Sequence, residues 1–168
     1  MKRFLLLGVL LFAAAGLVFG QADDVVKLKE KIIELQNKGE LGFQNFAICS
    51  NIIGFGSYVP VATPAFKAGD QILFYYEPHN VFTGRREGLY EIWYSQDMIV
   101  LDAKGNILLN KADALDFHYT SKTPVLDLYA TNSLDVGGLS PGKYQFKTVL
   151  KDRLRNKQVA KTAEFTIR

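Results

Sequence analysis

The chain has 168 residues, of which 20 are basic and 17 acidic, and 48% of its residues are hydrophobic. This length is sufficient for one domain with a hydrophobic core. Cys49 is the only cysteine, which excludes an intramolecular disulfide and predicts a buried structural thiol among its apolar neighbours.

Residues 1–20 have the features of a secretory signal peptide. The tripeptide MKR precedes the apolar run FLLLGVLLFAAAGLVF at residues 4–19, and small residues follow. The alternative is a retained membrane anchor, for which the run is slightly short. Cleavage after Gly20 leaves 18 basic and 17 acidic residues, a formal charge of +1. We therefore expect a periplasmic or secreted protein that retains no transmembrane segment and binds no nucleic acid.

Residues 21–40 are expected to form an amphipathic helix and a linker. An aspartate pair at 23–24 can cap the helix, and Gly39 can end it. Spacings of three and four residues place four aliphatic side chains on one stripe, a helix interaction face: Val25, Leu28, Ile32 and Leu35. We expect this stripe to dock on the chain's own domain, near Tyr75 and Trp93. The alternative is a handle for a partner or for oligomerisation.

From residue 41 onward the helical period disappears. Short apolar runs alternate with Gly, Pro, Asn and Asp, which is typical of an all-β domain. The pattern predicts an antiparallel sandwich of seven or eight strands over residues 41–168. The expected strands after the first lie at 71–77, 87–102, 107–110, 116–121 and 125–134, followed by two more in 139–168.

The segment LSPGKYQFKTVLKDRLRNKQVAKTAEFTIR at 139–168 has eight basic and two acidic residues. Alternation places its lysines on the outer face of a strand, which favours simple solvation over a binding surface for anions. Its start, LSPGKY, resembles the E–F corner of immunoglobulin-like and fibronectin type III-like sandwiches, in which a tyrosine bonds back to the corner backbone. Tyr144 takes that structural role in the resemblance.

Residues 41–168 together resemble the immunoglobulin-like extracytoplasmic modules of bacterial secreted proteins, a group without a common function. The resemblance rests on GFGSY, FKAGDQILFYYE and LSPGKYQFKTVLKD. It implies an immunoglobulin-like β-sandwich. An antibody-type domain is excluded, because the chain has no pair of cysteines for a disulfide between the sheets.

No motif in the sequence indicates an enzyme, a cofactor or a metal site. Two carboxylate–imidazole pairs, Glu77 with His79 and Asp116 with His118, could bind a metal only if the fold brought them together. Triads, phosphate-binding loops and zinc motifs have no counterpart here. We therefore expect no catalytic, cofactor-binding or metal-binding residues.

Aromatic residues suggest a binding surface. If strands 71–77 and 87–102 pair, Tyr75, Trp93 and Tyr94 lie close together, and alternation cannot bury all of them. The alternatives are burial in the core or cover by the helix. The expected function is a non-enzymatic binding module of the cell envelope with a protein partner. The alternative is a carbohydrate-binding module that stacks sugars on aromatics near Trp93.

Overall fold

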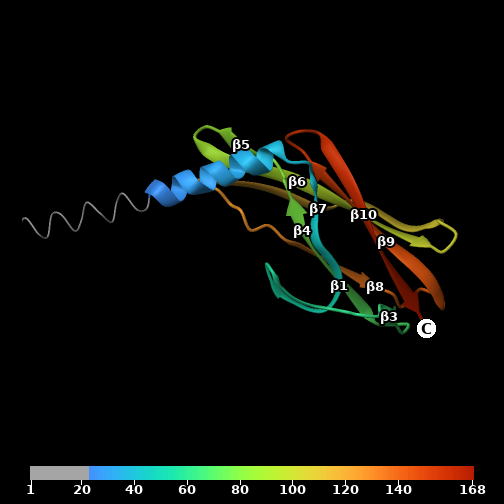
Figure 1. Ribbon diagram of the computed structural model, residues 1–168. Coiled ribbons are helices and arrows are strands. Elements are labelled where there is room, and N and C mark those ends of the chain that lie inside the picture. The colour runs from blue at the N-terminus through green and yellow to red at the C-terminus, as the bar shows by residue number, and fades with distance from the viewer. Residues whose placement is uncertain (1–22) are drawn as a thin grey trace, which may run out of the picture.

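The computed structural model describes residues 23–168, which form one helix followed by ten strands in two sheets (Figure 1). The expected all-β class is confirmed. The signal-peptide prediction lies outside the described residues. Within residues 23–168, no helix is long and apolar enough to cross a membrane.

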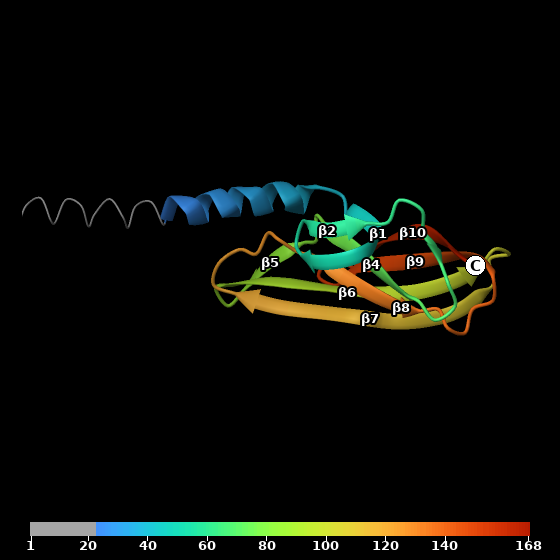
Figure 2. The same cartoon turned by 90° about the horizontal axis from the view of Figure 1, so that it is seen from below.

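The two sheets pack face to face, and the larger one is strongly curled (Figure 2). Every pair of strands is antiparallel except β3 with β10. Sheet A has the order β2 (Ser57–Pro60), β1 (Gly42–Gly54), β4 (Gln71–His79) and β8 (Ala130–Asp135). Sheet B has the order β3 (Ala65–Phe66), β10 (Lys157–Ile167), β9 (Gly142–Asp152), β6 (Leu89–Asp102) and β5 (Thr83–Arg86), with β7 (Ile107–Ser121) on the other edge of β6.

The strand pattern differs from the prediction in three ways. Segments 107–110 and 116–121 belong to one strand, β7, because a bulge at Asp113 (φ 46°) carries the chain across the expected break. Residues 122–129 are irregular and form a connector from sheet B to sheet A, although 125–129 were expected as the start of a strand. Three short strands, β2, β3 and β5, lie where loops were expected.

The core between the sheets has two parts. The closed half holds ten buried hydrophobic residues and is centred on Phe74 and Phe146, whose stacked ring centroids lie 3.7 Å apart. The open half holds four buried residues, Val81, Ile92, Tyr94 and Leu150, and is completed by side chains that keep partial contact with solvent.

Strands β9 and β10 follow the predicted alternation. The inward residues of β9, from Tyr144 to Leu150, are buried, whereas Lys143 is exposed. The hydroxyl of Tyr144 donates a hydrogen bond of 2.7 Å to the carbonyl of Ser140, four residues earlier.

The helix, residues 23–38, lies against the end of the sandwich beside β5 (Figures 1 and 2). The side chain of Asn37 pairs with both backbone groups of Thr83, at 2.9 Å each, as a neighbouring strand would. Ile33 is buried, and Glu30 contacts Arg85 and Tyr90.

The helix docks on its own domain, but the docked face is not the predicted stripe. Tyr75 and Trp93 are not its docking site either. Polar partners on β5 select the face of Glu30, Ile33 and Asn37, and hydrophobic spacing alone could not reveal those partners.

Candidate functional site

An aromatic groove of about 500 Å³ opens between sheet B and the connector 122–129. Tyr94 of β6 lies in its wall, with residues of β7, the connector and the start of β8. Its remaining lining residues are Leu115, Phe117, Tyr119, Val125, Asp127, Leu128, Tyr129, Ala130 and Thr131.

The groove exists because β7 is an edge strand of sheet B, and of sheet A only the start of β8 reaches the groove. Its residues Leu115, Phe117 and Tyr119 face the same side as Tyr94, because β7 pairs with β6 in the register Tyr94–Phe117. The irregular connector, with Ala130 and Thr131 at the start of β8, lies across the groove from these side chains. Pro124, a residue that cannot donate to a ladder, is buried within that connector.

One wall of the groove is formed by three neighbouring aromatic rings, those of Tyr94, Phe117 and Tyr119. The ring centroids of Tyr94 and Phe117 lie 5.2 Å apart, and those of Phe117 and Tyr119 lie 5.9 Å apart in a stacked arrangement. Tyr119 and Tyr129 are exposed by 46% and 42%. Rings held at this spacing offer flat faces to a third ring or to an apolar chain.

Tyr94 supplies a polar group at the groove. The residue is only 2% exposed, and burial raises the pKa of its phenol to about 12, so the hydroxyl remains protonated at neutral pH. Within residues 23–168 this hydroxyl makes no hydrogen bond. It is not fully enclosed, because among the described residues Thr148 Oγ1 is the only buried side-chain oxygen or nitrogen without a partner. The Tyr94 hydroxyl is therefore accessible as a donor or acceptor, and Tyr94 lines the groove.

The three residues predicted as a ligand or partner surface, Tyr75, Trp93 and Tyr94, lie in three different places. Tyr94 faces the core and the groove, Trp93 lies on the outer face of sheet B, and Tyr75 lies on the outer face of sheet A. Strands β4 and β6 belong to different sheets and do not pair, so the three do not form one surface.

Tyr75 is closed off from solvent by other tyrosines. Its ring stacks on Tyr58 at 4.2 Å and on Tyr129 at 6.0 Å, and the residue is fully buried. Its hydroxyl donates to Glu77 at 2.6 Å and accepts from the backbone of Gly56 at 2.8 Å. Burial and the bond to Glu77 raise the pKa of Tyr75 to about 12.

Trp93 belongs to a polar cluster on the outer face of sheet B. Its ring stacks on His118 at 4.7 Å, and its indole N–H donates to Asp116 at 2.8 Å. Glu91 lies 2.7 Å from Nε2 of His118. A carboxylate that orients an imidazole can hold or pass a proton. Among residues 23–168, however, no hydroxyl or thiol hydrogen-bonds to His118, so the pair has no nucleophile at hand.

The two carboxylate–imidazole pairs are not brought together. Glu77 is on sheet A, where Asn45 and Tyr75 bind it, and His118 is on sheet B with Glu91. In the described part of the chain, no three or more of the side chains that bind metals gather in one place.

The residues that form the aromatic groove were missed at the sequence level. Phe117, Tyr119 and Tyr129 fall in segments that look like ordinary strands, and their grouping depends on an edge position that the sequence does not reveal. The alternation of Leu115, Phe117 and Tyr119 was the one available signal, since it marks a strongly apolar strand face.

No family model matches the chain, and no curated protein matches it. Among solved structures, the chain resembles Pseudomonas fluorescens alkylpurine DNA glycosylase AlkC bound to DNA containing an abasic site analog, with 9% identity and a TM-score of 0.43. The match covers 77% of this chain and 31% of that chain, so the chain spans about a third of the length of the glycosylase.

This comparison contradicts three expectations. The chain was expected to be no enzyme, to bind a protein or a carbohydrate, and to bind no nucleic acid, whereas the matched protein is a glycosylase bound to DNA. The first and third expectations rested on absent motifs and on net charge, and neither describes the geometry of a site. The second rested on aromatic residues that the fold places apart. We withdraw them. A TM-score of 0.43 is also too low to transfer the enzyme's activity or its DNA to this chain.

Proposed function

We propose that this chain binds a small molecule with a flat apolar body and a hydrogen-bonding group, and that the aromatic groove is the site. The single observation that carries the proposal is the series of rings Tyr94, Phe117 and Tyr119, which lines one side of an open groove. Such rings offer flat apolar faces to a ligand, and the accessible hydroxyl of Tyr94 offers one hydrogen-bonding group.

The dimensions and chemistry of the groove support this proposal. Its volume of about 500 Å³ lies within the range of roughly 300–1,000 Å³ that is usual for small-molecule sites. Apolar walls with few polar groups are also usual, because burial gives affinity and the polar groups fix orientation. Here the polar groups are the Tyr94 hydroxyl on one wall and Asp127 and Thr131 elsewhere in the lining.

A second hollow, of about 530 Å³, supports no comparable proposal. It lies around β3, the start of β9 and the end of β10. The hydroxyl of Tyr144 in its wall is already bound to Ser140, and charged side chains of Lys143, Glu164 and Arg168 line it.

Titration with 6-propionyl-2-dimethylaminonaphthalene tests the proposal, because this fluorescent probe combines a flat ring system with a ketone acceptor. We expect saturable binding with a blue-shifted emission. Phe117→Ala should weaken binding about tenfold or more, because it removes a wall ring. Tyr94→Phe should weaken it about 2- to 10-fold, because it removes one hydrogen bond.

Tyr58→Phe is the matched control, because it also removes a phenol but lies on the outer face of sheet A beside Tyr75. Unchanged affinity is expected for it. Equal affinities for the original chain, Phe117→Ala and Tyr94→Phe would refute the groove as the site.

We also infer that the two-sheet body is of the immunoglobulin-like type and that the chain is exported. The bond from Tyr144 to Ser140 supports the first inference, because such a tyrosine corner is typical of these sandwiches. The order of charged, apolar and small residues in 1–20 supports the second. Mass spectrometry of the N-terminus in periplasmic and culture fractions tests export, and a cytoplasmic chain that still begins at Met1 would contradict it.

A further inference from the structure

The helix presents an apolar stripe that nothing in the described chain covers. Val25, Leu28, Ile32 and Leu35 are exposed by 51%, 59%, 42% and 69%. The opposite side of the helix is held by Glu30, Ile33 and Asn37, so the stripe is fixed on the free face. Four exposed aliphatic side chains in a row on a docked helix are unusual for a surface with no binding role.

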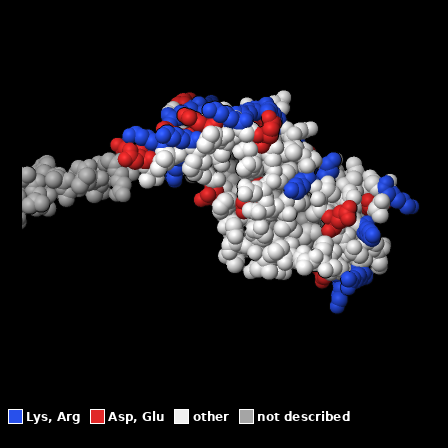
Figure 3. Space-filling model, in the orientation of Figure 1, with Lys and Arg blue, Asp and Glu red and all other residues white. Residues whose placement is uncertain are grey.

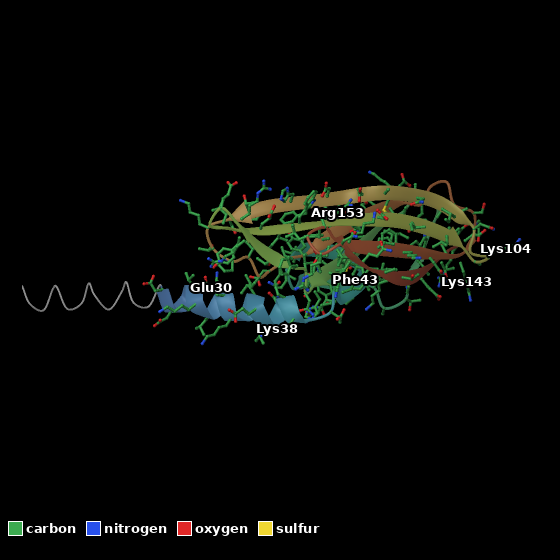
Figure 4. The ribbon with its side chains drawn as sticks, turned by 90° about the horizontal axis from the view of Figure 1, so that it is seen from above. Glu30, Lys38, Phe43, Lys104, Lys143 and Arg153 are labelled. Carbon is green, nitrogen blue, oxygen red and sulfur yellow. The ribbon has the colours of Figure 1, made fainter. Side chains whose placement is uncertain are left out.

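Lysines border the stripe. Lys27, Lys31 and Lys38 follow one another at spacings of four and seven residues, which places them on one flank. Lys31 is a neighbour of Leu28 and Leu35, and Lys27 also pairs with Asp24 at 3.4 Å, with both side chains exposed. Figure 3 shows charged side chains along the helix beside uncharged surface. Other lysines, such as Lys104 and Lys143, lie at the far end of the molecule (Figure 4).

The position of the helix in the chain and in space adds a second argument. The apolar run of residues 4–19 precedes the helix, separated from it by Gly20, Gln21 and Ala22. The helix begins beyond the end of the two sheets, so its first turns stand clear of the sandwich (Figures 1 and 2). The sandwich therefore does not block the stripe from a flat surface such as a membrane.

From these observations we infer that the stripe binds the surface of an anionic lipid bilayer, with the helix lying in the plane of the interface. The aliphatic side chains enter the boundary between headgroups and acyl chains, and the flanking lysines reach lipid phosphates. The docked face keeps the helix attached to the sandwich, so the domain is held at the membrane surface. The same contact forms whether residues 4–19 are retained or removed.

A local probe on the full chain tests this inference, because its signal does not depend on how the rest of the chain is anchored. Leu28→Cys is labelled with an environment-sensitive nitrobenzoxadiazole dye, and Cys49, which is 2% exposed, is protected by the fold. We expect a blue shift, and quenching by a lipid-borne quencher, with vesicles of phosphatidylglycerol and phosphatidylcholine. Pure phosphatidylcholine should give a smaller response.

The matched control carries the same dye at Ile107→Cys, an exposed aliphatic position (59%) in the β6–β7 turn region. No shift is expected there. In the chain labelled at position 28, Ile32→Glu should lower vesicle partitioning about tenfold or more, because a charge replaces an apolar group in the interface. Lys27→Gln with Lys31→Gln should reduce the preference for anionic vesicles.

Two outcomes would overturn the inference. One is equal responses at positions 28 and 107. The other is a blue shift at position 28 without vesicles, together with a dimer by light scattering that Ile32→Glu separates, because the occupant is then a second copy of the chain. Circular dichroism of each variant checks that the fold is unchanged, as expected for substitutions at exposed positions.

Discussion

The two halves of the core differ in how they are completed. In the closed half, strands of both sheets meet directly, and Phe74, Phe146 and Phe165 pack ring against ring. In the open half, β7 extends beyond sheet A, and an irregular connector takes the place of a strand. Regular strands thus close one half, whereas the other retains a groove with solvent access.

A polar layer separates the halves. Tyr76 of sheet A donates to Gln96 of sheet B, and Gln96 donates to Asn132 at 2.6 Å. Thr148 lies on β9 between Phe146 of the closed half and Leu150 of the open half, and its buried hydroxyl has no partner among residues 23–168. The two halves can therefore respond differently to the same substitution.

The largest expected effect is the loss of a ring from the closed half. Phe146→Ala should lower the free energy of unfolding by about 3–5 kcal/mol, because the cavity beside Phe74 cannot collapse between two sheets. Phe117→Ala, the same change in the open half, should cost less than half as much, because Phe117 is only partly buried. Urea denaturation of both variants makes the comparison. Equal losses would show that the open half is packed as tightly as the closed one.

Removing a single hydroxyl sharpens the same contrast. Tyr144→Phe should lower the free energy of unfolding by about 1–3 kcal/mol, because the carbonyl of Ser140 loses its donor. Tyr94→Phe should change it by less than about 0.5 kcal/mol, because the Tyr94 hydroxyl has no partner in the described chain. The denaturation midpoints measure both. An unchanged midpoint for Tyr144→Phe would show that the hydrogen bond from Tyr144 to Ser140 does not stabilise the fold.

The closed half could be predicted to a large extent from the sequence. Alternation in β9 identified the face that carries its lysines, and LSPGKY marked the bend that precedes this strand. Apolar and polar residues alternate along such a strand because only one of its faces is buried, and this alternation is visible in the sequence.

The groove and the docked face of the helix could not be predicted in this way. The groove depends on which strand is the edge of sheet B, and that is a property of the whole topology. The docked face depends on Asn37 meeting the free backbone of Thr83, 46 residues away. The hydrophobic stripe misled, because spacing reveals an apolar face but does not show what covers it.

The helix closes the end of the open half, and a substitution at Asn37 tests how much this contributes. Asn37→Ala should lower the free energy of unfolding by about 1–2 kcal/mol, because two hydrogen bonds to Thr83 are lost. Hydrogen exchange should become faster in β5 and leave the closed half unchanged. Lys38→Ala, an exposed neighbour, is the control. Faster exchange throughout both sheets would contradict the separation of the two halves.

The smallest expected effect concerns acid and the strand that forms the groove wall. Asp113, in the bulge of β7, accepts a hydrogen bond of 2.9 Å from Ser95 and pairs with Lys151 and Arg153. The hydrogen bond from Ser95 and these two cations hold the pKa of Asp113 below its ordinary value of 3.8. Arg153 of this network is labelled in Figure 4.

Because the folded-state pKa of Asp113 is lowered, its contribution to stability is present above the ordinary pKa and is lost as the pH falls through the lowered value. We expect β7 to loosen first in this range, with faster hydrogen exchange beside the groove before the closed half responds. In Asp113→Asn, β7 should already be loosened at neutral pH, and the loss of stability as the pH falls below about 4 should be shallower. Melting temperatures of both chains against pH measure the two slopes. Parallel slopes would mean that other carboxylates govern the acid response and that Asp113 does not brace the groove wall.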